Sequence, residues 1–70
     1  MTAVILNGEP RELPDGATVA EAVLAVGVSG DGRGVAVALD GEVVPRGEWA
    51  RTHVSEGQHV EVLHAVQGGA

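Results

Sequence analysis

Cysteine, lysine, tyrosine and phenylalanine are all absent from this chain of 70 residues, and Trp49 is its only aromatic residue. Without cysteine the chain can form no disulfide, no thiolate metal site and no cysteine nucleophile. With so few aromatics, its core must be aliphatic. A domain of this length buries only about 60% of its unfolded surface, so every helix and strand must contribute to that core.

Basic residues are also scarce. Four arginines stand against ten acidic residues, and the formal net charge is −6. Nucleic-acid binding requires a basic face that neutralises phosphates, so no nucleic-acid partner is expected, and an RNA-binding role is disfavoured. The acidic surface could favour a partner with a basic docking face, or could simply keep the protein soluble.

The chain lacks long apolar runs. No run reaches the 18 residues of a membrane span, and the first residues lack the basic region of a signal peptide. We therefore expect no membrane partner and a cytoplasmic location.

Groups that could carry catalysis are few and scattered. His59 and His64 are five residues apart in one predicted strand, which directs them to opposite faces, and His53 lies in another segment. The glycines at 30, 32 and 34 follow a predicted helix and precede a predicted strand, the reverse of a phosphate-binding loop. The carboxylates occur singly. We predict that the chain is not an enzyme and binds no metal or cofactor itself.

The first half of the chain predicts a hairpin. Ala3–Leu6 is an apolar run typical of a central strand, and Asn7-Gly8 is a strong signal for a type I′ turn. The return strand would be Glu9–Leu13, placed at a sheet edge because Pro10 cannot donate a backbone hydrogen bond.

A short helix should follow. Thr18 and Glu21 have the spacing of a capping box, and Gly27 is a natural C-terminal stop. The apolar stripe that would face a sheet contains Val19, Ala22, Val23 and Val26, widened by Leu24 and Ala25.

The second half predicts three more strands. These are Gly34–Leu39, Glu42–Val44 after an Asp40-Gly41 turn, and His59–Val66. Residues 46–51 should form a single helical turn that carries Trp49 over the core edge, although a large aromatic can also contact a partner. In the last strand, Val60 and Val62 should face the helix, which leaves Leu63 and Ala65 as an outward apolar patch. Leu63, Ala65 and Trp49 are thus the candidates for partner docking.

The element order is a hairpin, a helix, a second hairpin, a helical turn and a final strand. A right-handed crossover places the first and last strands side by side and parallel. This order predicts an α+β fold of the β-grasp type, the fold of ubiquitin, with a mixed sheet of about five strands and one main helix. Residues 1–66 would form the single domain and 67–70 a flexible tail.

The tail contains Gly68-Gly69 followed by Ala70. Glycines order at high entropic cost and offer no side chain for packing, so this segment is either a frayed end or a slender reactive end. A terminal carboxylate becomes reactive when it attacks the α-phosphate of ATP to form an acyl-adenylate, which must occur in a partner's pocket.

Several segments give the chain a family likeness. They are Ile5–Glu9, Asp15–Val19, Gly34–Arg46, Glu48–Ala50 and the ending from Glu56-Gly57 through Val60–Val62 to Val66–Gly69. On these segments the chain resembles the sulfur carrier proteins of thiamine biosynthesis, the ThiS family. The Val43–Arg46 stretch and Trp49 separate this family from other ubiquitin-like carriers better than the two glycines do.

The resemblance implies a β-grasp fold and a working C-terminus. An ATP-dependent adenylyltransferase related to ubiquitin-activating enzymes would adenylate the carboxylate of Gly69, and Gly68 would give it reach. Sulfur from a cysteine desulfurase route would convert it to a thiocarboxylate, which thiazole synthase would consume. ATP would be bound by the activating partner.

Ala70 departs from the family pattern, which ends at the second glycine. Ala70 could be removed by a peptidase, accepted by the partner, or be an inactivating extension, and we favour removal. Other readings are a carrier for molybdopterin, cysteine or a secondary metabolite, and a ubiquitin-like binding module without tail chemistry.

Overall fold

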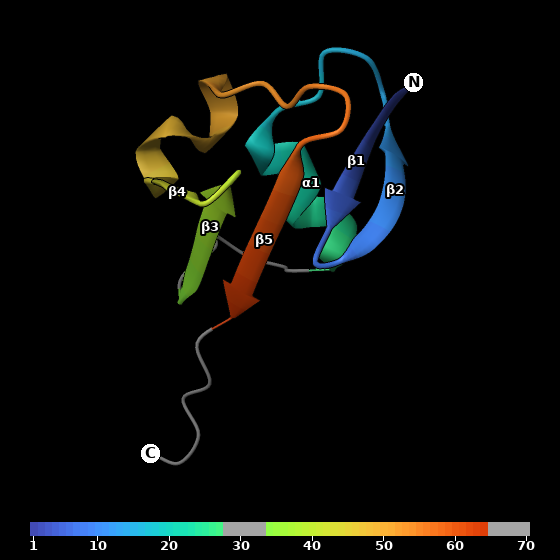
Figure 1. Cartoon of the computed structure of the whole chain (residues 1–70). Coiled ribbons are helices and arrows are strands. Elements are labelled where there is room, and N and C mark those ends of the chain that lie inside the picture. The colour runs from blue at the N-terminus through green and yellow to red at the C-terminus, as the bar shows by residue number, and fades with distance from the viewer. Residues whose placement is uncertain (28–33, 65–70) are drawn as a thin grey trace.

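The computed structural model describes residues 1–27 and 34–64 of the chain. Seven elements follow one another in the order predicted from the sequence (Figure 1). They are β1 (Thr2–Leu6), β2 (Glu9–Leu13), α1 (Val19–Val26), β3 (Val35–Leu39), β4 (Glu42–Val44), the 3₁₀ helix η1 (Arg46–Arg51) and β5 (His59–His64).

The five strands form one mixed sheet in the order β2-β1-β5-β3-β4. β1 and β5 are parallel, whereas the other neighbouring pairs are antiparallel. Figure 1 shows α1 behind the sheet, covering one of its faces, with β5 between β1 and β3. The β-grasp prediction is confirmed, as are the edge position of β2 and the parallel pairing of the first and last strands.

Both hairpins turn through residues with positive φ. Asn7 and Gly8 have φ of 51° and 84°, and Asp40 and Gly41 have φ of 50° and 87°. Two successive left-handed residues define a type I′ turn, whose twist matches that of the flanking strands. The two turns predicted from the sequence are therefore present.

α1 begins and ends as its sequence predicts. The Glu21 amide donates to Thr18 Oγ1 at 3.4 Å, and the Thr18 amide donates to Glu21 Oε1 at 2.9 Å, which completes the capping box. Gly27 ends the helix with φ of 99°. The prediction that Leu24 widens the apolar stripe is wrong, because Leu24 is 65% exposed. At 3.6 residues per turn it lies about 150° from the middle of the stripe.

The core lies between α1 and the inner face of the sheet. It consists of Val4, Leu6, Leu13, Ala17, Val19, Ala22, Val23, Val37, Val44, Trp49, Val54, Val60 and Val62. Trp49 closes one edge of this core, where its Nε1 donates to the carbonyl of Val44 at 2.8 Å. The predicted covering role of Trp49 is confirmed.

Element boundaries differ little from the predicted ones. β1 begins one residue earlier than expected, at Thr2, and β3 one residue later, at Val35. The last strand is described to His64, so its predicted continuation to Val66 lies outside the described residues, as do the predicted tail 67–70 and the glycines at 30 and 32.

Candidate functional site

The chain reaches its predicted working end through β5. This strand occupies the middle of the sheet, between β1 and β3, and its last described residue is His64. The predicted site residues Ala65, Gly68, Gly69 and Ala70 lie outside the described residues. The structure therefore describes the strand before the predicted site, β5, and its surroundings.

The two faces of β5 differ sharply. Val60 and Val62 are buried against α1, as predicted, while His59, Glu61 and Leu63 are exposed on the opposite face. Leu63 is 64% exposed. A large aliphatic side chain held outward from a central strand is a candidate contact for a partner.

Neighbouring strands extend this outward apolar surface. Leu63 lies opposite Ala36 of β3, and Val43 of β4 lies opposite Ala38. Directly opposed residues share a face of the sheet. Leu63, Ala36 and Val43 are exposed, Val43 by 75%, and we call these three residues the outer patch.

Asp40 anchors the beginning of β5. Its Oδ1 accepts from the His59 amide at 2.9 Å, and its Oδ2 accepts from Gln58 Nε2 at 3.0 Å. These two hydrogen bonds, the one from the His59 backbone first, lower the pKa of the Asp40 carboxyl. The carboxylate form of Asp40 is thus stabilised in the folded protein.

Asn7 binds the backbone of β5 further along the strand, at Val62. Its Oδ1 accepts from the Val62 amide at 2.7 Å, and its Nδ2 donates to the Val62 carbonyl at 3.3 Å. The local sequence around Asn7 and around Asp40 predicts turns only. The sequence offers no clear signal for these longer-range roles, because Asn, Asp and Gly all suit the same turn position.

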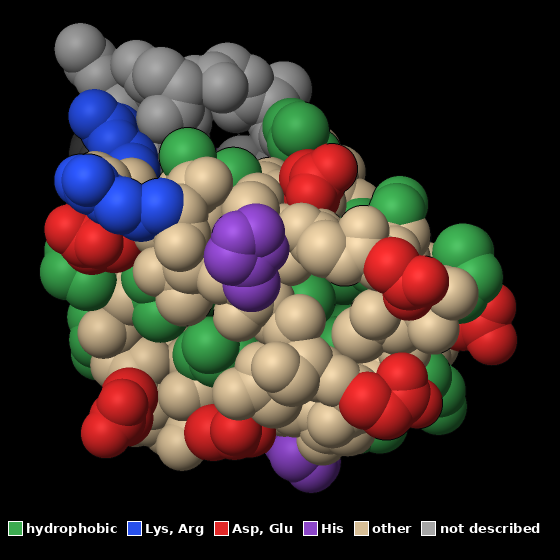
Figure 2. All heavy atoms as spheres, turned by 90° about the horizontal axis from the view of Figure 1, so that it is seen from above, with side chains coloured by type: hydrophobic (Ala, Val, Ile, Leu, Met, Phe, Trp, Pro, Cys, Tyr) green, Lys and Arg blue, Asp and Glu red, His purple; other side chains and the backbone are tan. Residues whose placement is uncertain are grey.

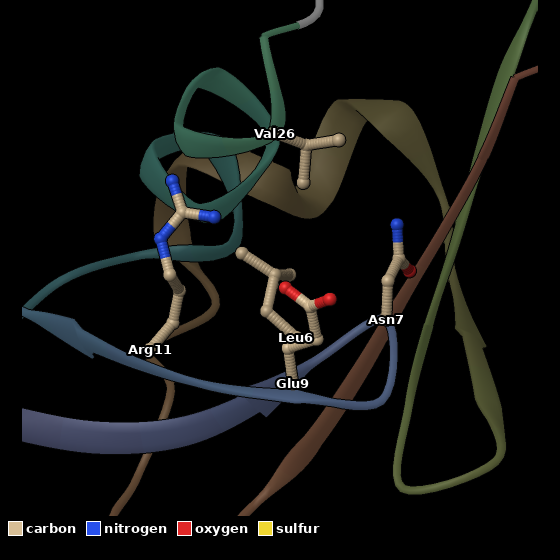
Figure 3. A pocket seen from close by; sticks show the side chains of 5 residues that line it. All are labelled: Leu6, Asn7, Glu9, Arg11 and Val26. Atoms are coloured by element: carbon tan, nitrogen blue, oxygen red, sulfur yellow. The ribbon is translucent and has the colours of Figure 1, made fainter.

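A pocket of about 220 Å³ opens between the β1–β2 hairpin and the end of α1. Figure 3 shows its lining residues: Leu6, Asn7, Glu9, Arg11 and Val26. Arg11 Nη2 donates to the Ala25 carbonyl at 2.7 Å, which satisfies a carbonyl in the last turn of α1. Arg11 therefore has a structural role there, and the sequence carries no signal for this pocket, because it forms between separate elements.

Charged groups do not gather into a single site among the described residues. Residues 1–27 and 34–64 contain no group of three or more His, Asp or Glu residues that could hold a metal ion. Figure 2 shows acidic side chains spread around one face and basic ones at one corner. In the described part of the chain, no helix is long and apolar enough to cross a membrane.

Trp49 differs from Leu63 as a docking candidate. Only 7% of Trp49 is exposed, and its Nε1 is already paired with the Val44 carbonyl. Packing and one internal hydrogen bond thus account for this residue, and its contact with a partner stays a prediction.

Known proteins of one family share this fold. The model of the ThiS family matches residues 4–69. A crystal structure of a thiamine biosynthesis protein (ThiS) from Geobacter metallireducens is 31% identical, with a TM-score of 0.77, and the alignment covers 97% of this chain and 100% of that one.

A solution structure of a thiamine biosynthesis protein from Geobacter metallireducens is also 31% identical, with a TM-score of 0.78. Here the alignment covers 99% of this chain and 90% of that one. No curated protein sequence matches the chain significantly. With a family match over nearly its whole length and a shared fold at 31% identity, the chain belongs to the ThiS family.

Proposed function

We propose that this protein is a sulfur carrier for thiazole formation in thiamine biosynthesis, with the carboxyl of Gly69 as its reactive group. The observation that carries the proposal is the family match, which extends from Val4 through Gly69. The names of the two Geobacter structures support the thiamine pathway. The fold adds support, since a rigid sheet whose central strand leads toward a slender glycine-containing segment suits the delivery of a carboxylate.

The proposed chemistry takes place in partners. The Gly69 carboxylate attacks the α-phosphate of ATP in an adenylyltransferase related to ubiquitin-activating enzymes, and pyrophosphate leaves. The terminal sulfur of a cysteine persulfide from a cysteine desulfurase route attacks the acyl-adenylate and displaces AMP, which gives an acyl disulfide. A second thiol of the partner then attacks the persulfide cysteine's own sulfur, so that a partner disulfide forms and the thiocarboxylate leaves. Thiazole synthase then takes the sulfur. The carrier itself supplies a terminus without side chains, which can enter a narrow active site.

Ala70 requires a further step in this proposal. We propose that a peptidase removes it by hydrolysis of the Gly69–Ala70 peptide bond, which exposes the Gly69 carboxylate. The family match includes Gly69 but not Ala70, and this supports Gly69 as the reactive position. Acceptance of Ala70 by the partner and inactivation by Ala70 are the alternatives.

The outer patch is the proposed docking surface for the activating partner. It lies on β5, β3 and β4, and its member Leu63 is next to the last described residue, His64. A partner that covers Leu63 would hold the segment after His64 close to its own active site. Ala65 would extend this surface, as the strand alternation predicts.

Intact-mass spectrometry tests the chemistry directly. The chain is incubated with the activating enzyme from the same cell, ATP and a sulfur donor, with and without prior removal of Ala70. Replacement of one oxygen by sulfur should add about 16 Da to the form that ends at Gly69. An unchanged form ending at Gly69, or a thiocarboxylate on intact Ala70, would contradict the assignment.

A second experiment separates the carrier from the alternatives. Deletion of residues 68–70 should abolish sulfur transfer while circular dichroism stays unchanged, whereas a simple binding module would keep its function. Release of sulfur to thiazole synthase identifies the thiamine pathway. A thiocarboxylate that forms but is not consumed by thiazole synthase would point to another acceptor.

A further inference from the structure

The parallel pairing of β1 with β5 ends before β5 does. The last paired residues are Leu6 and Val60, after which β1 enters its turn at Asn7-Gly8. Among the described residues, β5 continues to His64 and is paired there with β3 alone, in which Val37 lies opposite Val62. On the side of β1, the backbone of Val62 would be left without a strand partner.

The side chain of Asn7 takes the place of the missing strand. Ile5 N donates to the Gln58 carbonyl and Asn7 N to the Val60 carbonyl, both at 2.9 Å. Asn7 Nδ2 then donates to the next carbonyl in the series, that of Val62, and Asn7 Oδ1 accepts from the Val62 amide. The carboxamide thus extends the ladder with one peptide-like group. Figure 3 shows the Asn7 side chain beside the β5 ribbon.

This contact explains why the turn carries asparagine. Positive φ is compatible with Gly, Asn and Asp, and the second type I′ turn does use Asp40. Val62, however, presents an amide and a carbonyl together, so its partner must accept and donate at once. A carboxamide does both, a carboxylate only accepts, and glycine has no side chain.

We propose that Asn7 is a positioning residue for the sulfur-carrying end: its carboxamide binds Val62 on the side of β1 while β3 pairs with the other side, so that β5 is held in a defined direction as far as His64. The inference rests on the proposed function, because direction matters only if the segment after His64 must enter a partner. Without this clamp, the partner would have to order the strand end on binding, at a cost in affinity.

Two substitutions at Asn7 separate this role from the turn. Asn7→Gly keeps a residue suited to positive φ but removes both hydrogen bonds to Val62. Asn7→Asp keeps the acceptor for the Val62 amide and removes the donor. The matched control is Asp40→Gly, which preserves the second turn and removes the clamp at the opposite end of β5, on His59.

The first measurement is amide hydrogen exchange by NMR, which needs no partner. In Asn7→Gly, the Val62 amide should exchange about tenfold faster relative to Leu63, which pairs with Ala36 of β3. Equal acceleration of both amides would indicate a general loss of stability and would contradict a local clamp.

The second measurement is ATP–pyrophosphate exchange by the activating enzyme at varied carrier concentration. If the wild type is active only without Ala70, each variant is also used without Ala70, and otherwise with it. The temperature is one at which Trp49 fluorescence shows that every variant is folded. Asn7→Gly should raise KM about fivefold with kcat unchanged, Asn7→Asp should be intermediate, and Asp40→Gly should match the wild type.

Two results would overturn the proposal. One is a KM for Asn7→Gly equal to that of the wild type, and the other is an equal rise for Asp40→Gly, which would reveal an effect of stability alone. If the wild type itself supports no pyrophosphate exchange, the proposed function fails and the positioning role with it, while hydrogen exchange still decides whether the clamp exists.

Discussion

Single residues in the two hairpin turns combine a local and a distant task. Asn7 and Asp40 both adopt a positive φ, and both use their side chains to bind β5. The turn conformation positions these side chains, because a left-handed residue directs its Cβ differently from a strand residue. The central strand therefore depends on residues that the local sequence marks only as turns.

Acid should weaken the clamp at Asp40. Because its folded pKa is lowered, Asp40 stabilises the native state above the pKa of the unfolded chain, and this stabilisation is lost as pH falls below about 4. In urea titrations followed by Trp49 fluorescence, Asp40→Asn should lose less stability than the wild type between pH 7 and pH 3.

Glu12→Gln is the control for that experiment, since it removes another exposed carboxylate. It should leave the acid-induced loss close to that of the wild type. The pKa of Asp15 is also lowered, by hydrogen bonds from the Met1 amino group and then from the Thr2 hydroxyl, so part of the acid dependence should remain in Asp40→Asn. An identical pH profile for Asp40→Asn and the wild type would contradict the prediction.

Two glycine-to-alanine substitutions should isolate the cost of backbone strain, because neither site is crowded. A Cβ added at Gly41 or at Gly47 would meet nothing within 4 Å, but only Gly41 has a positive φ, of 87°. Gly41→Ala should therefore cost about 1–2 kcal/mol of unfolding free energy through strain alone. Gly47→Ala should be neutral or add up to about 1 kcal/mol, because it restricts the unfolded chain. Equal effects in urea unfolding would contradict this.

At the scale of elements, α1 depends on its termini. With eight residues it is too short to persist alone, so capping and packing on the sheet must stabilise it. The segment after η1 adds support there, since Val19 N donates to the Thr52 carbonyl at 2.8 Å and Val54 N to the Ala17 carbonyl at 3.0 Å. The helix start is thus joined to the connection that leads into β5.

Thr18→Ala should destabilise the protein by removing the acceptor of the Glu21 amide. The bond is long, at 3.4 Å, so we expect a cost near the low end of the usual range, about 0.5–1 kcal/mol. Thr18→Ser retains the hydroxyl and serves as the control. Urea unfolding measures both, and a Thr18→Ser variant as unstable as Thr18→Ala would assign the effect to the lost methyl group instead.

At the scale of the whole molecule, one face of the sheet is covered and the other is available. α1 covers the inner face of the sheet, while the outer patch lies on the opposite face. The core between α1 and the sheet, which provides stability, is therefore separate from the outer patch, which is proposed to bind a partner. Substitutions on the outer face should therefore affect binding more than folding.

Leu63 and Leu24 form a matched pair for that prediction. They are 64% and 65% exposed, on β5 and on α1 respectively. Leu63→Gln should lower kcat/KM of adenylation at least about tenfold, as loss of a central docking contact does, whereas Leu24→Gln should leave it unchanged. Both variants should unfold within about 0.5 kcal/mol of the wild type. Equal activity of the two variants would exclude Leu63 from the docking surface.

Local sequence determined most of the elements. The capping box at Thr18 and Glu21, the two turns, the edge position marked by Pro10 and the alternation in the last strand depend on near neighbours, because backbone dihedrals and side-chain periodicity are local properties. The handedness of crossover connections added the parallel neighbours. The glycines and the family likeness led to the prediction that the C-terminus is the working end.

Only the tertiary structure decided the register and the contacts that depend on it. The bond of Asn7 to Val62 joins residues 55 positions apart, and it exists because β1 ends opposite Val60 while β5 continues. Such contacts arise from the relative placement of whole elements, on which the residues next to Asn7 carry little information.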